Sequence, residues 1–194
     1  MLRSYRILSC VKRARNPYPN RQSFRLKRYD YSAPDAYFVT IVAEHRLRMF
    51  GFVNCGVMHL SPLGAMVHSA ITGMSRWYPG VRIDAFQVMP DHIHVVVWLT
   101  AATTGPSHRD ATDPISNVVA PRLTLPDVVQ RLKSFTTGQY RHGAARSRWR
   151  SIGHRLWQRN YYESIIRKRA ALDAIRRYIR NNPPNWSRPK RYKK

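Results

Sequence analysis

Cysteine is scarce in this chain of 194 residues, which contains Cys10 and Cys55 alone. Two thiols so far apart in the sequence cannot build a disulfide framework or supply a cysteine-type zinc site. The chain also lacks any apolar run near the roughly 18 residues that a membrane-spanning helix needs. Its basic N-terminus is interrupted by Ser9 and Lys12, which makes a poor signal peptide. We therefore expect a cytoplasmic protein in a reducing setting, with no membrane contact.

Acidic residues are scarce as well, because ten Asp and Glu oppose 34 Lys and Arg and leave a formal net charge of +24. A surface with this charge attracts polyanions, and nucleic acid is the partner we expect. A basic enzyme that does not act on nucleic acid is the alternative. Hydrophobic residues make up 43% of the chain, enough for a globular domain with its own core. Together these features predict a nucleoid-associated protein.

The apolar patterns predict an α+β fold. Valine-rich, isoleucine-rich or aromatic runs indicate strands at 36–43, 52–60, 86–99 and 161–166, of which 52–60 reads as a short strand or a hairpin. Helical periodicity indicates helices at 62–77, 125–140 and 170–182. Ser61 and Pro62 fit the start of the first helix, since serine caps a helix and proline suits its first position. This order fits one antiparallel sheet with helices packed on one face.

Basic segments are expected outside this core. We divide the chain into a basic N-terminal arm (1–24), a domain (25–186) that carries a surface loop (100–122), and a basic tail (187–194). Arginine, lysine and tryptophan side chains in the arm, after the second helix and in the tail suit phosphates and unpaired bases. The alternative is that these segments are only solvated or disordered. The predicted nucleic-acid-binding residues are Arg21, Arg25, Lys27, Arg28, Lys133, Arg146, Arg148, Trp149, Arg150, Arg155, Arg159, Arg188, Lys190 and Arg191.

Two histidines stand two residues apart in the valine-rich strand that begins near Phe86. Successive side chains of a strand point to opposite faces, so His92 and His94 share one face and Ile93 lies on the other. Two imidazoles at this spacing can bind one metal ion. Taken alone the pair is weak evidence, because histidines at the surface or at the edge of a core give the same pattern.

The helix predicted at 170–182 adds a tyrosine and an amide. Tyr178 and Asn182 are four residues apart, which places them on one helical face. A tyrosine can form a covalent intermediate, and an amide oxygen can complete a metal site begun by two histidines. The alternatives are a half-buried tyrosine and an asparagine that caps the helix. Tyr161 and Tyr162 are rival nucleophiles, but they precede the helix and lack an asparagine at helical spacing.

Four motifs together resemble the single-tyrosine HUH transposases (IS200-like), and among these the REP-associated tyrosine transposases of bacteria. The motifs are Arg25-Leu-Lys-Arg-Tyr-Asp-Tyr-Ser followed by Ala36-Tyr-Phe-Val-Thr-Ile, Met89-Pro-Asp-His-Ile-His-Val, Leu156-Trp-Gln-Arg-Asn-Tyr-Tyr-Glu-Ser-Ile-Ile-Arg167, and Ile175-Arg-Arg-Tyr-Ile-Arg-Asn-Asn-Pro183. The resemblance covers about residues 22–186 in the expected order. Ser164 departs from it, because relatives often carry histidine there.

The resemblance implies a ferredoxin-like sheet, the HUH endonuclease fold, with the histidine pair on a central strand. It implies Mg²⁺ or Mn²⁺ bound by His92, His94 and Asn182, and Tyr178 as the nucleophile. It also implies an endonuclease and strand transferase that binds single-stranded DNA with REP-type palindromic hairpins and cleaves through a 5′-phosphotyrosine. Such an enzyme would serve DNA transposition or a domesticated mobilisation of REP elements.

Two other functions are alternatives to this one. A non-catalytic hairpin-binding protein on the same fold would carry the same charge but would not need Tyr178. A replication initiator or relaxase is expected to carry a further domain, for which 194 residues leave no room. Both a monomer and a homodimer stay open.

Overall fold

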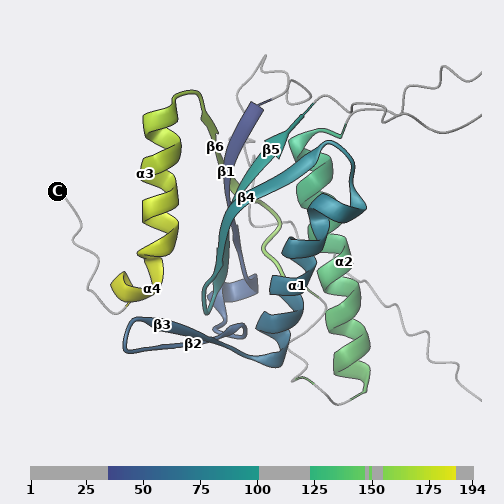
Figure 1. Cartoon of the computed structure of the whole chain (residues 1–194). Coiled ribbons are helices and arrows are strands. Elements are labelled where there is room, and N and C mark those ends of the chain that lie inside the picture. Colours follow the sequence, from purple (N-terminus) through teal and green to yellow (C-terminus); the bar gives the residue numbers. More distant parts are fainter. Residues whose placement is uncertain (1–34, 101–122, 147–148, 150–154, 187–194) are drawn as a thin grey trace, which may run out of the picture.

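Four antiparallel strands from distant parts of the chain form the main sheet (Figure 1). The computed structural model describes residues 35–100, 123–146, 149 and 155–186. In spatial order the strands are β4 (Val81–Val88), β5 (His92–Leu99), β1 (Asp35–Val42) and β6 (Tyr162–Ile166). The first and third of these strands along the chain are therefore central, and the second and fourth lie at the edges. This ferredoxin-like order confirms the predicted α+β sheet.

The helices and a separate hairpin complete the fold. The helices are α1 (Pro62–Trp77), α2 (Leu125–Ala145), α3 (Arg169–Arg180) and α4 (Asn182–Asn185), with a short 3-10 helix η1 (Glu44–Arg46) after β1. The hairpin consists of β2 (Gly51–Asn54) and β3 (Val57–Leu60), one of the two forms predicted for 52–60. α1 begins as predicted, because the Ser61 hydroxyl accepts a hydrogen bond from the Gly64 N–H (3.0 Å).

Alternation along β5 separates two faces of the sheet. Ile93, Val95 and Val97 belong to the larger core, which also contains the buried residues of α1 and α2. Val96, between them, belongs to a smaller cluster together with Leu172 and Ile179 of α3. Since these two clusters lie on opposite faces, each face of the sheet is covered by its own helices.

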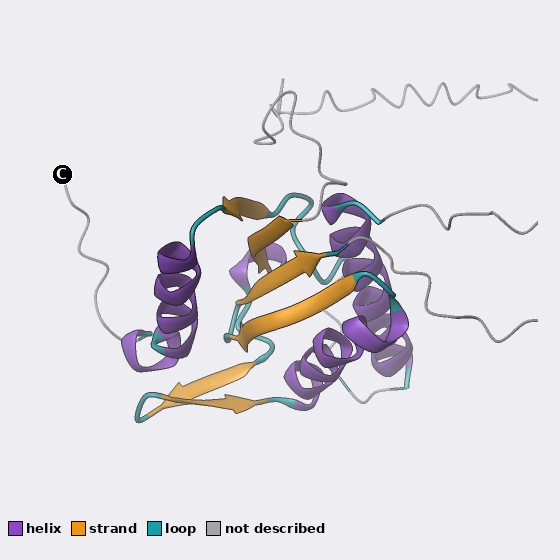
Figure 2. Ribbon diagram, turned by 45° about the horizontal axis from the view of Figure 1, so that its top comes forward, coloured by secondary structure: helices purple, strands orange, loops and turns teal. Residues whose placement is uncertain are grey.

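The prediction of helices on one face holds for α1 and α2, whereas α3 covers the opposite face (Figures 1 and 2). Its apolar stripe, Leu172, Ile175 and Ile179, packs against the second face rather than joining the larger core. This is also the face that carries His92 and His94, so the position of α3 brings a helix over the histidines.

The helix predicted at 170–182 ends earlier than its pattern indicates. α3 stops at Arg180, Asn181 caps it, and α4 begins at Asn182 and contains both prolines. Proline is tolerated in the first turn of a helix, where its missing N–H would have no partner. Pro183 and Pro184 therefore lie in the first turn of α4 and do not mark the end of α3. Tyr178 and Asn182 therefore lie on two different helices.

The basic arm at 1–24, the tail at 187–194 and all of the 100–122 loop except Thr100 lie outside the described residues. The proposed division into arm, domain and tail stays a prediction. No helix in the described ranges is both long and apolar enough to cross a membrane.

Candidate active site

The histidine pair lies on the face of β5 that α3 covers. His92 Nε2 and His94 Nε2 are 3.0 Å apart, and their rings meet edge to face with centroids separated by 4.6 Å. His94 is 4% exposed, and His92 is half-buried. The backbone places the pair, because alternate residues of β5 point to the same side. The two Nε2 atoms are thus directed toward one point at the surface of the sheet.

Asp91 orients the first histidine. Its Oδ1 is 2.5 Å from His92 Nδ1, and because a carboxylate can only accept, the ring donates from Nδ1, which leaves Nε2 as the nitrogen that faces His94. Arg46 also lies 3.6 Å from Asp91. Burial opposes the charge on Asp91, but the hydrogen bond from His92 and the charges of His92, Arg46 and Arg48 outweigh it, so the pKa of this carboxyl lies below its usual value.

Thr40 orients the second histidine from β1, the neighbouring strand. Its Oγ1 lies 2.8 Å from His94 Nδ1, and Phe38, on the same face of β1, stacks on the imidazole at 5.3 Å between ring centroids. Burial, with the charge of His92 added to it and Asp91 opposing, lowers the pKa of His94 from 6.5 to about 3. His94 is therefore neutral at physiological pH, which is the state in which imidazole binds a metal ion.

Tyr178 reaches this pair from α3. Its hydroxyl lies 3.4 Å from His94 Nε2, and its ring meets Phe38 edge to face at 5.9 Å. The side chain is 52% exposed, so a ligand can reach the hydroxyl. Tyr178 and the histidines are more than 80 residues apart in the sequence, and the structure brings these three side chains together.

An ion pair holds α3 on the sheet two residues before this tyrosine. Arg176 donates from Nε and Nη2 to the two carboxylate oxygens of Asp84 on β4, at 2.9 and 2.7 Å. The hydrogen bond from Arg176 lowers the pKa of Asp84, with burial opposing. Bidentate guanidinium–carboxylate pairs fix orientation as well as distance. The pair therefore sets how α3 lies over β4 and, with it, where Tyr178 stands.

Asp84→Asn is expected to loosen α3 without unfolding the rest of the domain. The amide loses the charge that the bidentate pair needs, so hydrogen exchange of α3 amides should quicken while α1 and α2 keep their protection. Because the folded-state pKa of Asp84 is lowered, the contribution of the pair is present above its ordinary pKa of about 4 and is lost as the pH falls below it. Hydrogen exchange at pH 7, with Asp35→Asn on the same sheet as control, checks this; equal quickening in all helices would contradict it.

Asn182 is not hydrogen-bonded to the histidines in the described part of the chain. It is half-buried at the start of α4. Within the described ranges, no group of three or more His, Cys, Asp and Glu side chains could hold a metal ion. The structure therefore offers two imidazole nitrogens for a cation, and the role of Asn182 as third ligand stays a prediction.

The rival tyrosines stand farther from the pair. Tyr161 packs against the larger core, and the Lys133 ammonium lies 5.5 Å from the centre of its ring. Tyr162 is 57% exposed and is paired with Thr40 across the β1–β6 ladder, so it shares the face of His94 two strands away. Two strand spacings amount to about 9.5 Å. Tyr178 is the tyrosine of these three that contacts a histidine of the pair.

Comparison with known proteins identifies the family. Residues 118–182 match the family model "Transposase IS200 like". An uncharacterised protein of Haemophilus influenzae (strain ATCC 51907 / DSM 11121 / KW20 / Rd) is 32% identical over 177 residues, which cover 89% of this chain and 93% of that protein. The chain belongs to the IS200-like transposase family.

A solved structure shares the fold of this transposase. It is a REP-associated tyrosine transposase bound to a REP hairpin, with a TM-score of 0.52 and 19% sequence identity over 86% of this chain and 76% of that one. At this level of identity the likeness concerns the fold, and it agrees with the ferredoxin-like order of the main sheet.

One predicted DNA contact of the transposase, Lys133, is engaged within the fold, and its contact with DNA stays a prediction. Lys133, on α2, donates its ammonium hydrogens to the backbone oxygens of Gln158, Arg159 and Asn160 at 3.0, 3.2 and 3.1 Å. Burial lowers the pKa of Lys133 to about 8, while the three carbonyl oxygens favour its charged form, so it is an ammonium at pH 7. All three N–H groups are used, and none is left for a phosphate. Sequence could not reveal this, because the three acceptors are backbone atoms some 25 residues away.

Lys133→Met is expected to lower the free energy of unfolding by about 2 kcal/mol, since hydrogen bonds from a charged donor are lost while the aliphatic stem is replaced. DNA affinity should change no more than in Arg76→Met, which removes an exposed charge from α1. Urea denaturation and oligonucleotide binding check the two parts. If Lys133→Met kept its free energy of unfolding and lost more DNA affinity than Arg76→Met, Lys133 would be a DNA contact and not a structural residue.

The remaining predicted DNA contacts divide into described and undescribed residues. Arg146, Arg155 and Arg159 are exposed, as a phosphate contact requires. Trp149 packs against the larger core, and a Cβ added at Gly143 of α2 would lie 2.3 Å from its ring; base stacking by this residue stays a prediction. Outside the described residues lie Arg21, Arg25, Lys27, Arg28, Arg148, Arg150, Arg188, Lys190 and Arg191.

Sequence reasoning missed the residues that support the histidines. Asp91 directly precedes His92, which was a readable signal, because a ligating histidine usually shares its second nitrogen with a carboxylate or a similar group. Thr40 could not have been found without the β1–β5 register. Trp186 lies 5.8 Å from His92 between ring centroids, and the Arg48 guanidinium lies 5.6 Å from the centre of the Trp186 ring. These two residues give the site an aromatic wall and an additional positive charge.

Proposed function

We propose that this transposase is a metal-dependent single-stranded DNA endonuclease and strand transferase with Tyr178 as its nucleophile. The observation that carries the proposal is the meeting of three groups: the Tyr178 hydroxyl lies 3.4 Å from His94 Nε2, which lies 3.0 Å from His92 Nε2. The fold, the family and the charge of +24 fit an enzyme that acts on a polyanion.

The residues present fit a divalent cation. Imidazole nitrogens bind metal ions at about 2.0–2.1 Å, so two nitrogens 3.0 Å apart can share one ion. Each ring is also held through its other nitrogen, His92 by Asp91 and His94 by Thr40, which is the support that ligating histidines usually have. The family favours Mg²⁺ or Mn²⁺, with Asn182 as a further ligand. When bound, the ion would polarise the phosphate and offset the charge that develops on it.

The chain's own residues provide the covalent step. Tyr178 attacks phosphorus through its hydroxyl oxygen, so that a P–O(tyrosine) bond forms and the P–O3′ bond breaks. The tyrosine proton passes to solvent, and the leaving 3′ oxygen takes up a proton, which leaves a 5′-phosphotyrosine and a free 3′-hydroxyl. One phosphodiester bond is replaced by another, so the bond energy is retained. A later hydroxyl can therefore reseal the strand without a nucleotide cofactor. Phe38 and the α3 ion pair hold the tyrosine in place for this step.

Palindromic hairpins are the substrate that we propose, as DNA of the REP type. The support is the shared fold with a transposase whose solved structure holds a REP hairpin. The exposed arginines Arg146, Arg155 and Arg159 are suited to its phosphates. We propose that the DNA is held as single strand at the histidine face, where the scissile phosphate must meet Tyr178.

A covalent adduct tests the proposal. The full chain is incubated with a labelled single-stranded hairpin oligonucleotide and Mn²⁺ or Mg²⁺, denatured, and analysed by electrophoresis. We expect a denaturation-resistant protein–DNA band, and mass spectrometry of its peptides should place the nucleotide on Tyr178 rather than on Tyr161 or Tyr162. Tight hairpin binding without any adduct, at each metal tried, would establish the non-catalytic hairpin-binding function instead.

A further inference from the structure

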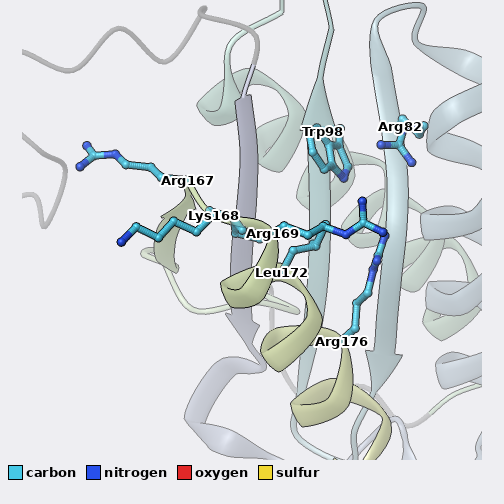
Figure 3. Close-up of a pocket in the computed structure, with 8 residues that line it drawn as sticks. Arg82, Trp98, Arg167, Lys168, Arg169, Leu172 and Arg176 are labelled. Atoms are coloured by element: carbon cyan, nitrogen blue, oxygen red, sulfur yellow. The ribbon is translucent and has the colours of Figure 1, made fainter.

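A second basic site lies at the opposite end of α3 from Tyr178 (Figure 3). It is a pocket of about 360 Å³. Its lining residues are Trp98, Ile166 and Leu172 together with five cationic side chains, those of Arg82, Arg167, Lys168, Arg169 and Arg176. None of these belongs to the DNA contacts that the sequence predicted.

The pocket continues the catalytic face of β5. Trp98 is four residues after His94 on the same strand, so the two side chains share a face. At about 3.3 Å per residue their backbones are about 13 Å apart. A few nucleotides of extended single strand can bridge this distance, with one phosphate at the histidine pair and another at the pocket.

Two of the cations are less firmly engaged than Arg176 and can bind an anion in the pocket. Arg176 is already engaged, by Asp84 and by Asp173 at 3.2 Å. Arg82 is 55% exposed and lies 3.8 Å from Asp84, and Arg169 is 84% exposed and lies 3.7 Å from Asp173. Arg169 and Asp173 form an exposed pair, which contributes little to stability. The Asp84 side chain is 9% exposed, but Arg176 already holds both of its carboxylate oxygens, so Arg82 is its weaker partner.

The direction of the side chains supports this choice. The Arg82 guanidinium lies over the Trp98 ring, 4.9 Å from its centre. Figure 3 shows the Arg169 side chain extending from α3 toward Trp98, whereas those of Arg167 and Lys168 extend away from it. In addition, α3 begins without a side-chain cap and without an acidic residue in its first turn, so its own first turn does not neutralise the positive end of the helix dipole.

We propose that this pocket binds a phosphate of the single-stranded DNA that flanks the cleaved phosphodiester, with Arg82 and Arg169 as its ligands. The nature of the ligand rests on the proposed function. Guanidinium groups match phosphate oxygens in geometry and charge, and the indole and leucine wall gives the adjoining sugar or base an apolar surface. The pocket thus anchors the strand at a second point and fixes its direction along β5.

Binding to an oligonucleotide with unpaired flanks tests the proposal. The paired variant Arg82→Gln with Arg169→Gln is prepared in a Tyr178→Phe background, so that no cleavage occurs, and affinity is measured by fluorescence anisotropy between 50 and 200 mM salt. We expect affinity about tenfold weaker and a log–log salt slope smaller by about 0.7, for one lost phosphate contact on a single strand. Arg76→Gln with Arg141→Gln, which removes the same charge from the helices on the other face, should retain more of the affinity and the slope.

Two arms make the outcome decisive. With a fully paired hairpin that lacks flanks, the variant and the control are expected to bind alike; an equal loss on both oligonucleotides would overturn the proposal in favour of a general charge effect. Parent-like affinity and slope in the variant would overturn it as well. Because binding is measured without cleavage, a flank-dependent loss combined with the absence of any adduct in the unmodified protein would refute the nuclease and keep the pocket.

Discussion

Tyr178→Phe is expected to form no covalent adduct with single-stranded hairpin DNA. The substitution removes the hydroxyl that lies 3.4 Å from His94 Nε2 and keeps the ring that packs edge to face on Phe38. Nucleophilic catalysis of this kind has no partial substitute, because the covalent bond requires that oxygen. The loss should exceed about 10³-fold, near the limit of detection, while hairpin affinity stays within about twofold.

Tyr162→Phe is the matched control, since it removes a hydroxyl from an exposed tyrosine on the same face of the sheet. It should form the adduct as the unmodified protein does. Electrophoresis after denaturation measures both variants. An undiminished adduct in Tyr178→Phe, or its loss in Tyr162→Phe alone, would move the nucleophile to Tyr162 and refute the role assigned to α3.

Replacement of both histidines is expected to have the second largest effect. In His92→Ala with His94→Ala, the two nitrogens that could share a cation are gone, and with them several kcal/mol of stabilisation of the developing charge on the phosphate. Cleavage should fall by about 10³-fold, and DNA binding in EDTA should stay within about twofold. Addition of EDTA to the unmodified protein should reproduce the loss of cleavage.

Two further variants separate the metal from the fold. His94 is 4% exposed, so His94→Gln, which preserves more of its volume, guards against a loss caused by a cavity. His142→Ala removes an exposed histidine of α2 and should leave activity unchanged. Titration of Mn²⁺ followed by electron paramagnetic resonance should show one bound ion in the unmodified protein and none in the double variant. Normal cleavage by the double variant would exclude this metal site.

Periodicity predicted most of the fold because the signals were local. The continuous apolar run of β5 reflects burial on both faces of the sheet, and the three- and four-residue spacing of α1 reflects burial of one helical face. Both patterns can be read from the sequence. The same signals could not show which face of the sheet α3 would cover. That choice depends on how its short apolar stripe meets Val96 and Ile166, which stand on strands far apart in the chain.

The residues of the candidate site that belong to short motifs could be predicted from the sequence. Those whose contacts depend on strand register or on backbone atoms could not. His92, His94 and Tyr178 came from short motifs. Thr40 became visible through the β1–β5 pairing. The hydrogen bonds of Lys133 could not be predicted, because its carbonyl partners carry no sequence signal. The break at Asn181 was missed because prolines can end one helix or begin the next.

Because side chains alternate along β5, its residues are under two different kinds of selection, one for folding and one for function. Ile93, Val95 and Val97 are needed for folding, and substitutions there are costly whether or not the protein cuts DNA. His92 and His94 point to the other face and, in the proposed mechanism, hold the cation, so their replacement leaves the larger core in place. In a lineage that abandons strand cleavage but still uses the protein to bind DNA, the odd-numbered positions should stay apolar while the even-numbered histidines drift. A comparison of these two sets of positions among related proteins would therefore show which proteins have kept strand cleavage.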